Sequence, residues 1–293
     1  AGSSTIPNFD ANFPVDFTFL RTPASSSDWF TGARLIGHQV VKTNSSAAET
    51  AATAAYWRFD DNKGWNAYNG YDSSYQSWMF KRHAGMDLVA YVGNGTQVTS
   101  KTIPHQLSKT PEMMWVKNRD HAEDWLVYHK GLDGGNQPET HYLVLSQDSA
   151  EGDLATAWND TAPTSTHFTV GSIINTNGND DNMIAMLFAS VDNISSVGAY
   201  SGSSSNVSVT TGFQPRFILI KRTNAPGQWA LFDTVRGLTS SGSGGDYVIY
   251  PNQNWEQSAA GTYIDLSSTG FTITSNWVGI NAASNEYVYY AHA

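Results

Sequence analysis

Apolar and polar positions alternate in short blocks through residues 215–237, PRFILIKRTNAPGQWALFDTVRG. The apolar run at 217–220 is short and rich in β-branched residues, which favours a strand over a helix. Residues 224–227, Asn-Ala-Pro-Gly, supply turn chemistry, because proline fixes φ and glycine tolerates a positive φ. A second apolar run begins at Trp229. The block therefore predicts a β-hairpin.

The same layout recurs earlier in the chain, closely at 111–134 and more weakly at 14–37. In the two closer blocks a tryptophan follows the opening proline by 14 residues, and in the weaker block it follows by 15. These tryptophans are Trp29, Trp125 and Trp229. The period is about 100 residues, and self-similarity at a fixed period indicates a repeated structural unit.

Other features keep the same period. Lys117 and Lys221 each lie six residues after the proline, where the first block has Leu20 followed by Arg21. A glutamate follows each hairpin, as Glu49, Glu151 and Glu256. An apolar strand closes each copy, at 77–81, 183–189 and 286–291. Tyrosine-containing strands at 89–93 and 198–202 open the second and third copies.

These anchors predict an all-β protein made of three tandem β-sandwich units of about 100 residues. The units are 1–88 (an N-terminal arm with a degenerate β unit), 89–197 and 198–293. Strands recur every 8 to 15 residues with turn residues between them, which is typical of sandwiches and barrels. Each unit is large enough for a core of its own, in which Trp29, Trp125 and Trp229 are the expected anchors. Residues 45–55 are the one helix candidate.

Composition narrows the functional classes. The net charge of −10 and pI near 5.1 disfavour nucleic acid as a partner, because phosphate backbones would be repelled. Cysteine is absent, which excludes disulfides, thiolate nucleophiles and cysteine metal sites. No apolar run approaches the roughly 18 residues of a membrane span, so we expect no membrane insertion. Few charges and many Ser, Thr, Asn, Gly and aromatic residues favour an extracellular type of β protein. For such a protein, the absence of cysteine favours a bacterial or phage source.

Four segments carry a family resemblance: NSSAAE (44–49), GAYSG (198–202), GFQPRFILIKRTNAPGQWALFDTVRG (212–237) and TGFTITSNWVGINAASNEYVYYAHA (269–293). They resemble a tandem-repeat domain of unknown function in structural proteins of marine tailed phages, notably cyanophages. Some of those proteins look like tail-fibre or other virion-surface components with lectin-like sandwiches of the concanavalin A or jelly-roll type. The resemblance implies a virion-surface β-sandwich protein and carries no catalytic residues.

The recurring glutamates are the first candidates for chemistry. A sandwich glycosidase needs two carboxylates about 5 to 10 Å apart. Glu151 is followed by Asp153 without a second glutamate, and Glu256 has no acidic partner nearby in sequence. The favoured interpretation is therefore a repeated carboxylate that orders a turn. We assign no catalytic residue.

Two kinds of metal site are conceivable. The Asp120-His121-Ala-Glu123-Asp124 cluster could hold a metal, but it lies in a hairpin turn whose sister copies lack it, which favours a solvated turn. Oxygen-rich loops are weak Ca²⁺ candidates and lack EF-hand spacing. Their carboxylates are Asp60, Asp61, Asp180 and Asp181. We expect no other cofactor.

The aromatic segment 56–78 is the best candidate for a ligand surface, because flat rings beside Asn and Asp suit sugars. Its candidate carbohydrate-binding residues are Trp57, Trp65, Tyr68, Tyr71 and Tyr75. The alternative is that these rings fill the core of the first unit or an interface with another subunit.

The leading hypothesis is a non-enzymatic virion-surface structural protein, such as a tail-fibre, appendage or decoration subunit. It would form a homo-oligomer or bind other virion proteins, and it would adhere to host surfaces, with cell-surface polysaccharide as a possible ligand. A free lectin-like carbohydrate-binding module is the alternative, followed by a sandwich glycoside hydrolase.

Overall fold

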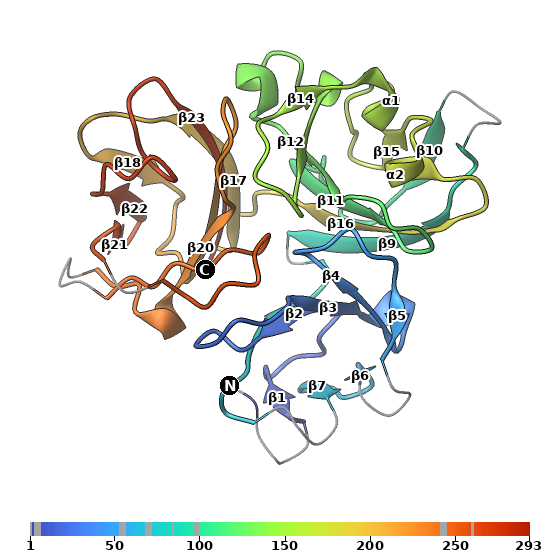
Figure 1. The fold of residues 1–293 in the computed structure, drawn as a ribbon, viewed down its shortest axis with the longest axis horizontal. Coiled ribbons are helices and arrows are strands. Elements are labelled where there is room, and N and C mark those ends of the chain that lie inside the picture. The colour runs from blue at the N-terminus through green and yellow to red at the C-terminus, as the bar shows by residue number, and fades with distance from the viewer. Residues whose placement is uncertain are drawn as a thin grey trace.

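The computed structural model describes residues 2, 7–52, 57–67, 72–83, 85–95, 100–240, 245–258 and 261–293. Its strands form three groups that surround a common centre (Figure 1). All pairings between named strands lie within a group and are antiparallel. The all-β sandwich prediction is confirmed.

The first group has a five-stranded sheet in the order β5-β4-β3-β2-β8 and a three-stranded sheet in the order β1-β7-β6. Its strands are β1 (Phe9–Asp10), β2 (Phe17–Arg21), β3 (Phe30–Ala33), β4 (Gln39–Lys42), β5 (Thr50–Ala51), β6 (Trp57–Arg58), β7 (Gly64–Ala67) and β8 (Gln76–Phe80). The N-terminal arm is tied down as β1, where Phe9 is buried and stacks on Trp65.

The second group has a six-stranded sheet in the order β14-β13-β12-β11-β16-β9 and the pair β10-β15. Its strands are β9 (Met86–Val92), β10 (Lys101–Pro104), β11 (Met113–Asn118), β12 (Leu126–His129), β13 (His141–Val144), β14 (Gly152–Asp153), β15 (His167–Val170) and β16 (Asn182–Phe188).

The third group has a four-stranded sheet in the order β17-β23-β19-β20 and a three-stranded sheet in the order β18-β22-β21. Its strands are β17 (Ser195–Ser201), β18 (Val207–Thr210), β19 (Phe217–Arg222), β20 (Ala230–Asp233), β21 (Ile264–Ser267), β22 (Gly270–Ile273) and β23 (Glu286–His292).

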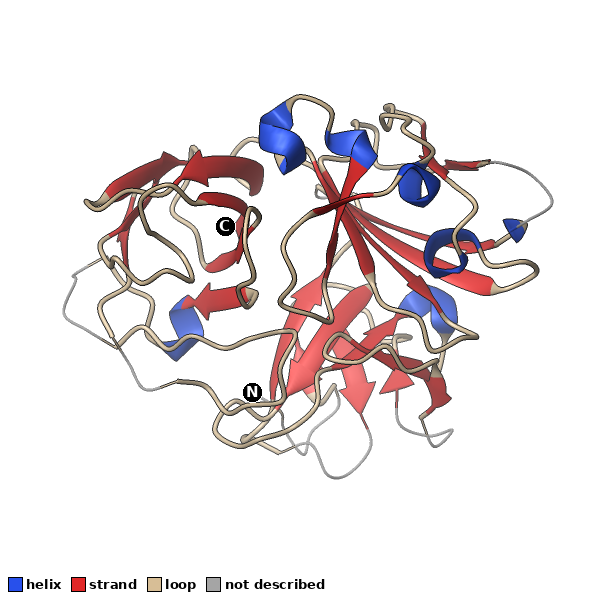
Figure 2. Cartoon of the chain, turned by 45° about the horizontal axis from the view of Figure 1, so that its top comes forward, coloured by secondary structure: helices blue, strands red, loops and turns tan. Residues whose placement is uncertain are grey.

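Helices in the described residues are single turns that lie at the ends of strands (Figure 2). They are η1 (Arg34–Ile36), η3 (Leu132–Gly135), η4 (Pro138–Thr140), α1 (Ala155–Trp158), α2 (Ile174–Asn177) and η5 (Thr234–Arg236). The helix candidate at 45–55 is wrong over its described part, because Thr50 pairs with Val40 as β5 and the N–H of Glu49 donates to a neighbouring group.

The three predicted hairpins are present with one register. They are β2–β3, β11–β12 and β19–β20, in which Phe17 pairs with Ala33, Met113 with His129 and Phe217 with Asp233. This register makes Arg21, and not Leu20, the counterpart of Lys117 and Lys221. Each of these cations precedes its tryptophan by eight residues. The expected boundaries at 88/89 and 197/198 fall inside β9 and β17, and the division into three copies of one unit stays a prediction.

Each hairpin sheet is buried on both faces. In β19, Phe217 and Leu219 face a core shared by all three groups, while Ile218 and Ile220 face the smaller sheet of their own group. The other groups behave in the same way and have separate outer cores. The expectation of one core per unit therefore holds for the outer faces, and the shared core is an addition that the sequence did not predict.

Aromatic rings from the three groups meet in the shared core. Phe19 lies 6.4 Å from Trp115 and 6.2 Å from Phe217, measured between ring centroids. Phe188 of the second group lies 5.0 Å from Tyr290 of the third. Because large buried aromatics dominate core energetics, these contacts join the groups into one body.

Candidate functional site

We call the contact region between two neighbouring sheet groups a seam. The tryptophans that recur in the sequence lie at these seams. Trp29, Trp125 and Trp229 are each at most 2 % exposed. The indole N–H groups donate across a seam, from Trp29 to Tyr250 O at 2.8 Å, from Trp125 to Lys42 O at 2.8 Å and from Trp229 to Val144 O at 2.9 Å. The bonds therefore run in a cycle: the tryptophan of the first group bonds the third group, that of the second group bonds the first, and that of the third group bonds the second. The three tryptophans are buried, but they lie in the core shared by all three groups and not, as expected, in a separate core of each unit; each also bonds a neighbouring group.

A buried cation accompanies each tryptophan. Arg21, Lys117 and Lys221 are fully buried and donate to backbone carbonyls of the neighbouring group. These bonds run from Arg21 to Gln253 and Asn254, from Lys117 to Ser46, and from Lys221 to Asp148 and Ser149. Burial lowers the pKa of Arg21 to about 10, of Lys117 to about 8 and of Lys221 to about 7. The carbonyl dipoles compensate each desolvated cation, which otherwise would be costly to bury.

Two of the three recurring glutamates also serve the structure. Glu49 forms a bidentate pair with Arg119 of the second group, at 2.7 and 3.1 Å, with both side chains mostly buried. The carboxylate of Glu151 accepts the N–H of Asp133, which has a φ of 51°. Glu256 is exposed. Glu151 therefore orders a turn, as the sequence analysis favoured, whereas Glu49 forms an ion pair between the first and second groups.

Backbone bonds define which residues correspond at the seams. The N–H groups of Glu49 and Glu151 donate to Arg119 O and Thr223 O, at 2.7 and 2.8 Å. In the third seam the donor is Gln257, whose N–H bonds Pro23 O at 2.8 Å. Gln257 therefore takes the place that the sequence comparison gave to Glu256.

The Asp120–Asp124 cluster is divided among separate partners. Asp120 accepts the N–H of Asn182, His121 lies 3.2 Å from Asp181, and Asp124 accepts from Ser146 and Gln147. Among the described residues, no group of three or more His, Cys, Asp or Glu side chains is arranged to hold a metal.

The four carboxylates considered for Ca²⁺ do not converge. Asp61 accepts the N–H of Lys63 within its own turn. Asp180 accepts from Asn179, and Asp181 accepts from Asn118 at 2.7 Å. Asp60 is exposed and lies at a pocket in the first group.

Two of the five predicted sugar-binding aromatics are core residues. Trp57 and Trp65 are 2 % and 0 % exposed, with ring centroids 4.6 Å apart. The core-filling alternative is therefore confirmed for both, and the sugar-stacking prediction is wrong for them because their faces are covered. Tyr75 is partly buried and packs against the same core. Tyr68 and Tyr71 lie outside the described residues.

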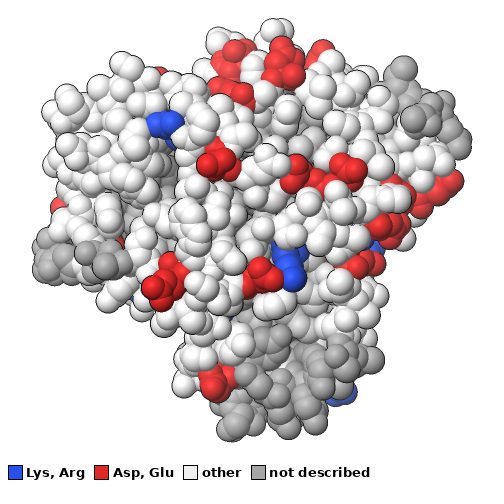
Figure 3. All heavy atoms as spheres, in the orientation of Figure 1, with Lys and Arg blue, Asp and Glu red and all other residues white. Residues whose placement is uncertain are grey.

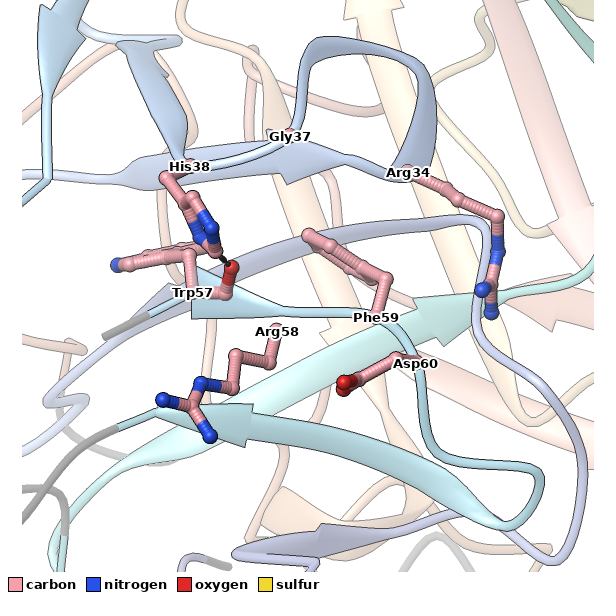
Figure 4. A pocket seen from close by; sticks show the side chains of 7 residues that line it. All are labelled: Arg34, Gly37, His38, Trp57, Arg58, Phe59 and Asp60. Atoms are coloured by element: carbon pink, nitrogen blue, oxygen red, sulfur yellow. Dashed lines mark hydrogen bonds between the residues drawn. The ribbon is translucent and has the colours of Figure 1, made fainter. Parts of the chain in front are cut away.

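A pocket of about 490 Å³ lies beside this core (Figure 4). It is lined by Arg34, Gly37, His38, Trp57, Arg58, Phe59 and Asp60. Arg34 is already bonded to Asp16 at 3.0 Å, and a His38 ring nitrogen lies 2.6 Å from the carbonyl oxygen of Trp57. Figure 4 shows the two guanidinium groups at opposite ends, pointing in different directions. They are therefore not aimed at one anionic ligand.

An exposed tryptophan lies instead in the third group, at the edge of a cluster of buried and partly buried aromatic rings. Trp255 is 50 % exposed, and its ring lies 5.8 Å from that of Tyr250, edge to face. Tyr250 also contacts Trp277 at 6.3 Å, and Trp277 contacts Tyr263 at 5.6 Å. We call Tyr250, Trp255, Tyr263 and Trp277 the aromatic platform.

Sequence reasoning missed this platform because it treated 252–256 only as a repeat anchor. The seam bonds provide the missing signal. Two residues before the backbone donors Glu49, Glu151 and Gln257 lie Ala47, Ser149 and Trp255. A tryptophan that replaces small residues in sister positions stands out once the register is known.

The sequence model of one family, a domain of unknown function designated DUF7483, matches residues 17–293. The chain belongs to this family. The DUF7483 match spans all three sheet groups together. No curated protein and no solved structure matches the chain.

On one face of this DUF7483 domain, more acidic than basic side chains are visible. On the face shown in Figure 3, Asp and Glu side chains are spread along the second group, and few Lys or Arg side chains are visible. No helix in the described part of the chain has the length and apolar character needed to cross a bilayer.

Proposed function

We propose that this protein is a non-enzymatic structural component of a tailed-phage virion exterior. It would be a fibre, appendage or decoration subunit that assembles with copies of itself or with other virion proteins and adheres to the host surface. The observation that carries the proposal is the use of the recurring polar residues. The tryptophans, the buried cations and Glu49 all tie one sheet group to the next.

A virion-surface subunit benefits from such a construction. The shared core and the three seams restrain the groups relative to one another, which favours a rigid body that can present loops at fixed positions. The net charge of −10 also opposes nonspecific adhesion to nucleic acid during packaging. The resemblance of the sequence to cyanophage structural repeats supports the virion context.

The experiment that tests this proposal is localisation on particles. Antibodies raised against the full chain, coupled to gold, are applied to intact virions of a phage that encodes it. Exterior labelling, together with an oligomer in light scattering of the purified chain, is the expected result. The proposal would be overturned if intact virions carried no gold label while the antibodies detected the protein free in infected host cells.

A carbohydrate-binding module is the second candidate, because the exposed face of Trp255 is available to a ligand. A sandwich glycosidase is the third. If the chain were a glycosidase, it would release reducing sugar from host polysaccharide and Glu151→Gln would abolish that release. Because Glu151 orders the turn at Asp133, we expect no such activity to depend on it.

A further inference from the structure

We propose that the third sheet group binds a neutral saccharide, with one sugar ring stacked on the exposed face of Trp255. This inference rests on the proposed adhesion function and names its ligand class and site. The chain has ten tryptophans, all within the described residues, and Trp255 alone among them is classed as exposed. Leaving half of such a large apolar side chain in water forfeits hydrophobic stabilisation that burial would supply.

The fold does not require a tryptophan at this position. The corresponding residues at the other two seams are Ala47 and Ser149. Those seams nevertheless make the same backbone bond, and in each of them the buried cation donates to the carbonyl oxygen three residues before the backbone donor, as Arg21 does to Asn254 O. A large ring at Trp255 is therefore an addition to a framework that is complete without it.

The loop that carries Trp255 is held from both sides. Arg21 donates to the carbonyl oxygens of Gln253 and Asn254, at 3.3 and 3.4 Å. The N–H of Ser27 also donates to Asn254 O at 2.9 Å, and Gln257 bonds Pro23 two residues further on. Tyr250 supports the indole edge to face. A ring held in place before binding loses little conformational entropy when a ligand stacks on it.

A second feature of the same sheet group suits an uncharged, hydroxyl-rich ligand. A pocket of about 300 Å³ lies at the turn that also carries Trp277. It is lined only by hydroxyl and amide residues: Ser204, Ser205, Asn206, Thr274, Ser275, Asn276 and Asn281. Asn281 is buried and bonds Ser205 O and Ser275 O, so it shapes the pocket, while Asn276 is exposed. A lining without charged groups offers no counter-ion to an acidic sugar and many partners to hydroxyl groups.

A saccharide combines the two properties that the platform and the pocket require. The C–H face of a pyranose ring is apolar and flat enough to cover an indole, and its hydroxyl groups exchange hydrogen bonds with amides and other hydroxyls. Asn254 and Glu256, the neighbours of Trp255 in sequence, are exposed as well. The carboxylate of Glu256 and the net charge of −10 disfavour uronic acids and sulfated sugars.

The test uses the full chain on an array of neutral oligosaccharides and of acidic ones such as uronic acid polymers. Serine is the residue found at the corresponding position of another seam, Ser149, so the Trp255→Ser variant is expected to fold. Val235→Ser is the matched control, because Val235 is 72 % exposed and lies outside the platform. Circular dichroism and light scattering accompany each variant.

We expect wild type and Val235→Ser to bind the same neutral glycans, and Trp255→Ser to bind them at least tenfold more weakly. Asn276→Ala should weaken binding by a smaller factor. The inference is overturned if the array shows no neutral ligand, if acidic glycans alone bind, or if Trp255→Ser binds as wild type. It is also overturned if Trp255→Ser turns an oligomer into a monomer, since a second copy of the chain would then cover the ring. None of these results alters the virion-labelling experiment, so the two proposals fail separately.

Discussion

Lys221 makes the stability of the protein depend on pH in a way that Arg would not. The ammonium group is fully buried and donates to three backbone carbonyls, two of them in the second sheet group. Burial lowers its pKa to about 7 in the folded protein, whereas an unfolded chain keeps a lysine near 10.4. Between these values the unfolded state binds one more proton than the folded state.

The sign and size follow from proton linkage. Stability rises with pH wherever the unfolded state binds more protons, by about 1.4 kcal/mol per pH unit for one group. Lys221 therefore adds about 2 kcal/mol to the free energy of unfolding between pH 7 and pH 9. Lys117, whose pKa is lowered to about 8, adds roughly 1.4 kcal/mol over the same interval. Well below pH 7, about one to two pH units under the folded-state pKa of Lys221, both lysines are protonated in both states and this contribution is constant.

The diagnostic variant is Lys221→Arg. Arg21 occupies the corresponding position at another seam and donates to Asn254 O, the counterpart of the Asp148 O that Lys221 contacts, so the guanidinium group is expected to fit. Because its pKa lies near 10 at that seam, an arginine stays charged up to pH 9. In this variant, the free energy of unfolding should therefore rise less between pH 7 and pH 9. The contribution of Lys221, which is the larger one, is lost, and the contribution of Lys117 remains.

The measurement is urea unfolding at pH 7, 8 and 9, with midpoints and slopes fitted at each pH. Lys81→Arg is the control, because Lys81 is exposed and its replacement should leave the pH profile unchanged. The window ends at pH 9 because unfolded tyrosines begin to ionise near pH 10. A wild-type profile that is flat or falling, or a Lys221→Arg profile as steep as wild type, would refute the reasoning.

Three further outcomes follow from the seams. Trp125→Phe removes an indole N–H that bonds the first group, and urea unfolding should show a loss of about 1–3 kcal/mol. Glu49→Gln should cost a similar amount, about 1–3 kcal/mol, because it leaves Arg119 without its carboxylate, and 0.5 M NaCl should change this cost little; Glu256→Gln should cost nothing measurable. Residues 195–293 expressed alone should lack near-ultraviolet dichroism and aggregate, since the inner face of their large sheet would meet water; a well-dispersed NMR spectrum of that segment would contradict this.

The hairpins were predictable because their chemistry is local. The alternation at 217–220 and the Asn-Ala-Pro-Gly turn specify β19 and β20 without reference to the rest of the chain. The tryptophan spacing likewise identified Trp29, Trp125 and Trp229 as core residues. What failed was the position of the cation in the first copy, because the opening proline there is offset by one residue and strand register was needed to align Arg21.

The aromatic segment shows a different limit. Residues 56–78 have no clear period, so the sequence gives no direction for any one ring. Trp57 and Trp65 turn inward because the short strands β6 and β7 form the outer layer of the first group. The exposed Trp255 lies in a loop whose position is set by Arg21, more than 230 residues away in sequence. Local pattern cannot distinguish these two cases, because burial is decided by contacts distant in sequence.

The shared core had one sequence signal, which lies in the hairpin strands themselves. A strand at the surface of a two-layer sandwich alternates apolar and polar residues, whereas FILIK at 217–221 is apolar on both faces until its cation. Both faces of such a strand must be packed against other residues, and the smaller sheet of its own group packs against only one of them. The other two groups pack against the other face, and the buried cations bond across the seams at the ends of these strands. The large sheets of all three groups thus contribute residues to one shared core, and the single family match includes all three groups.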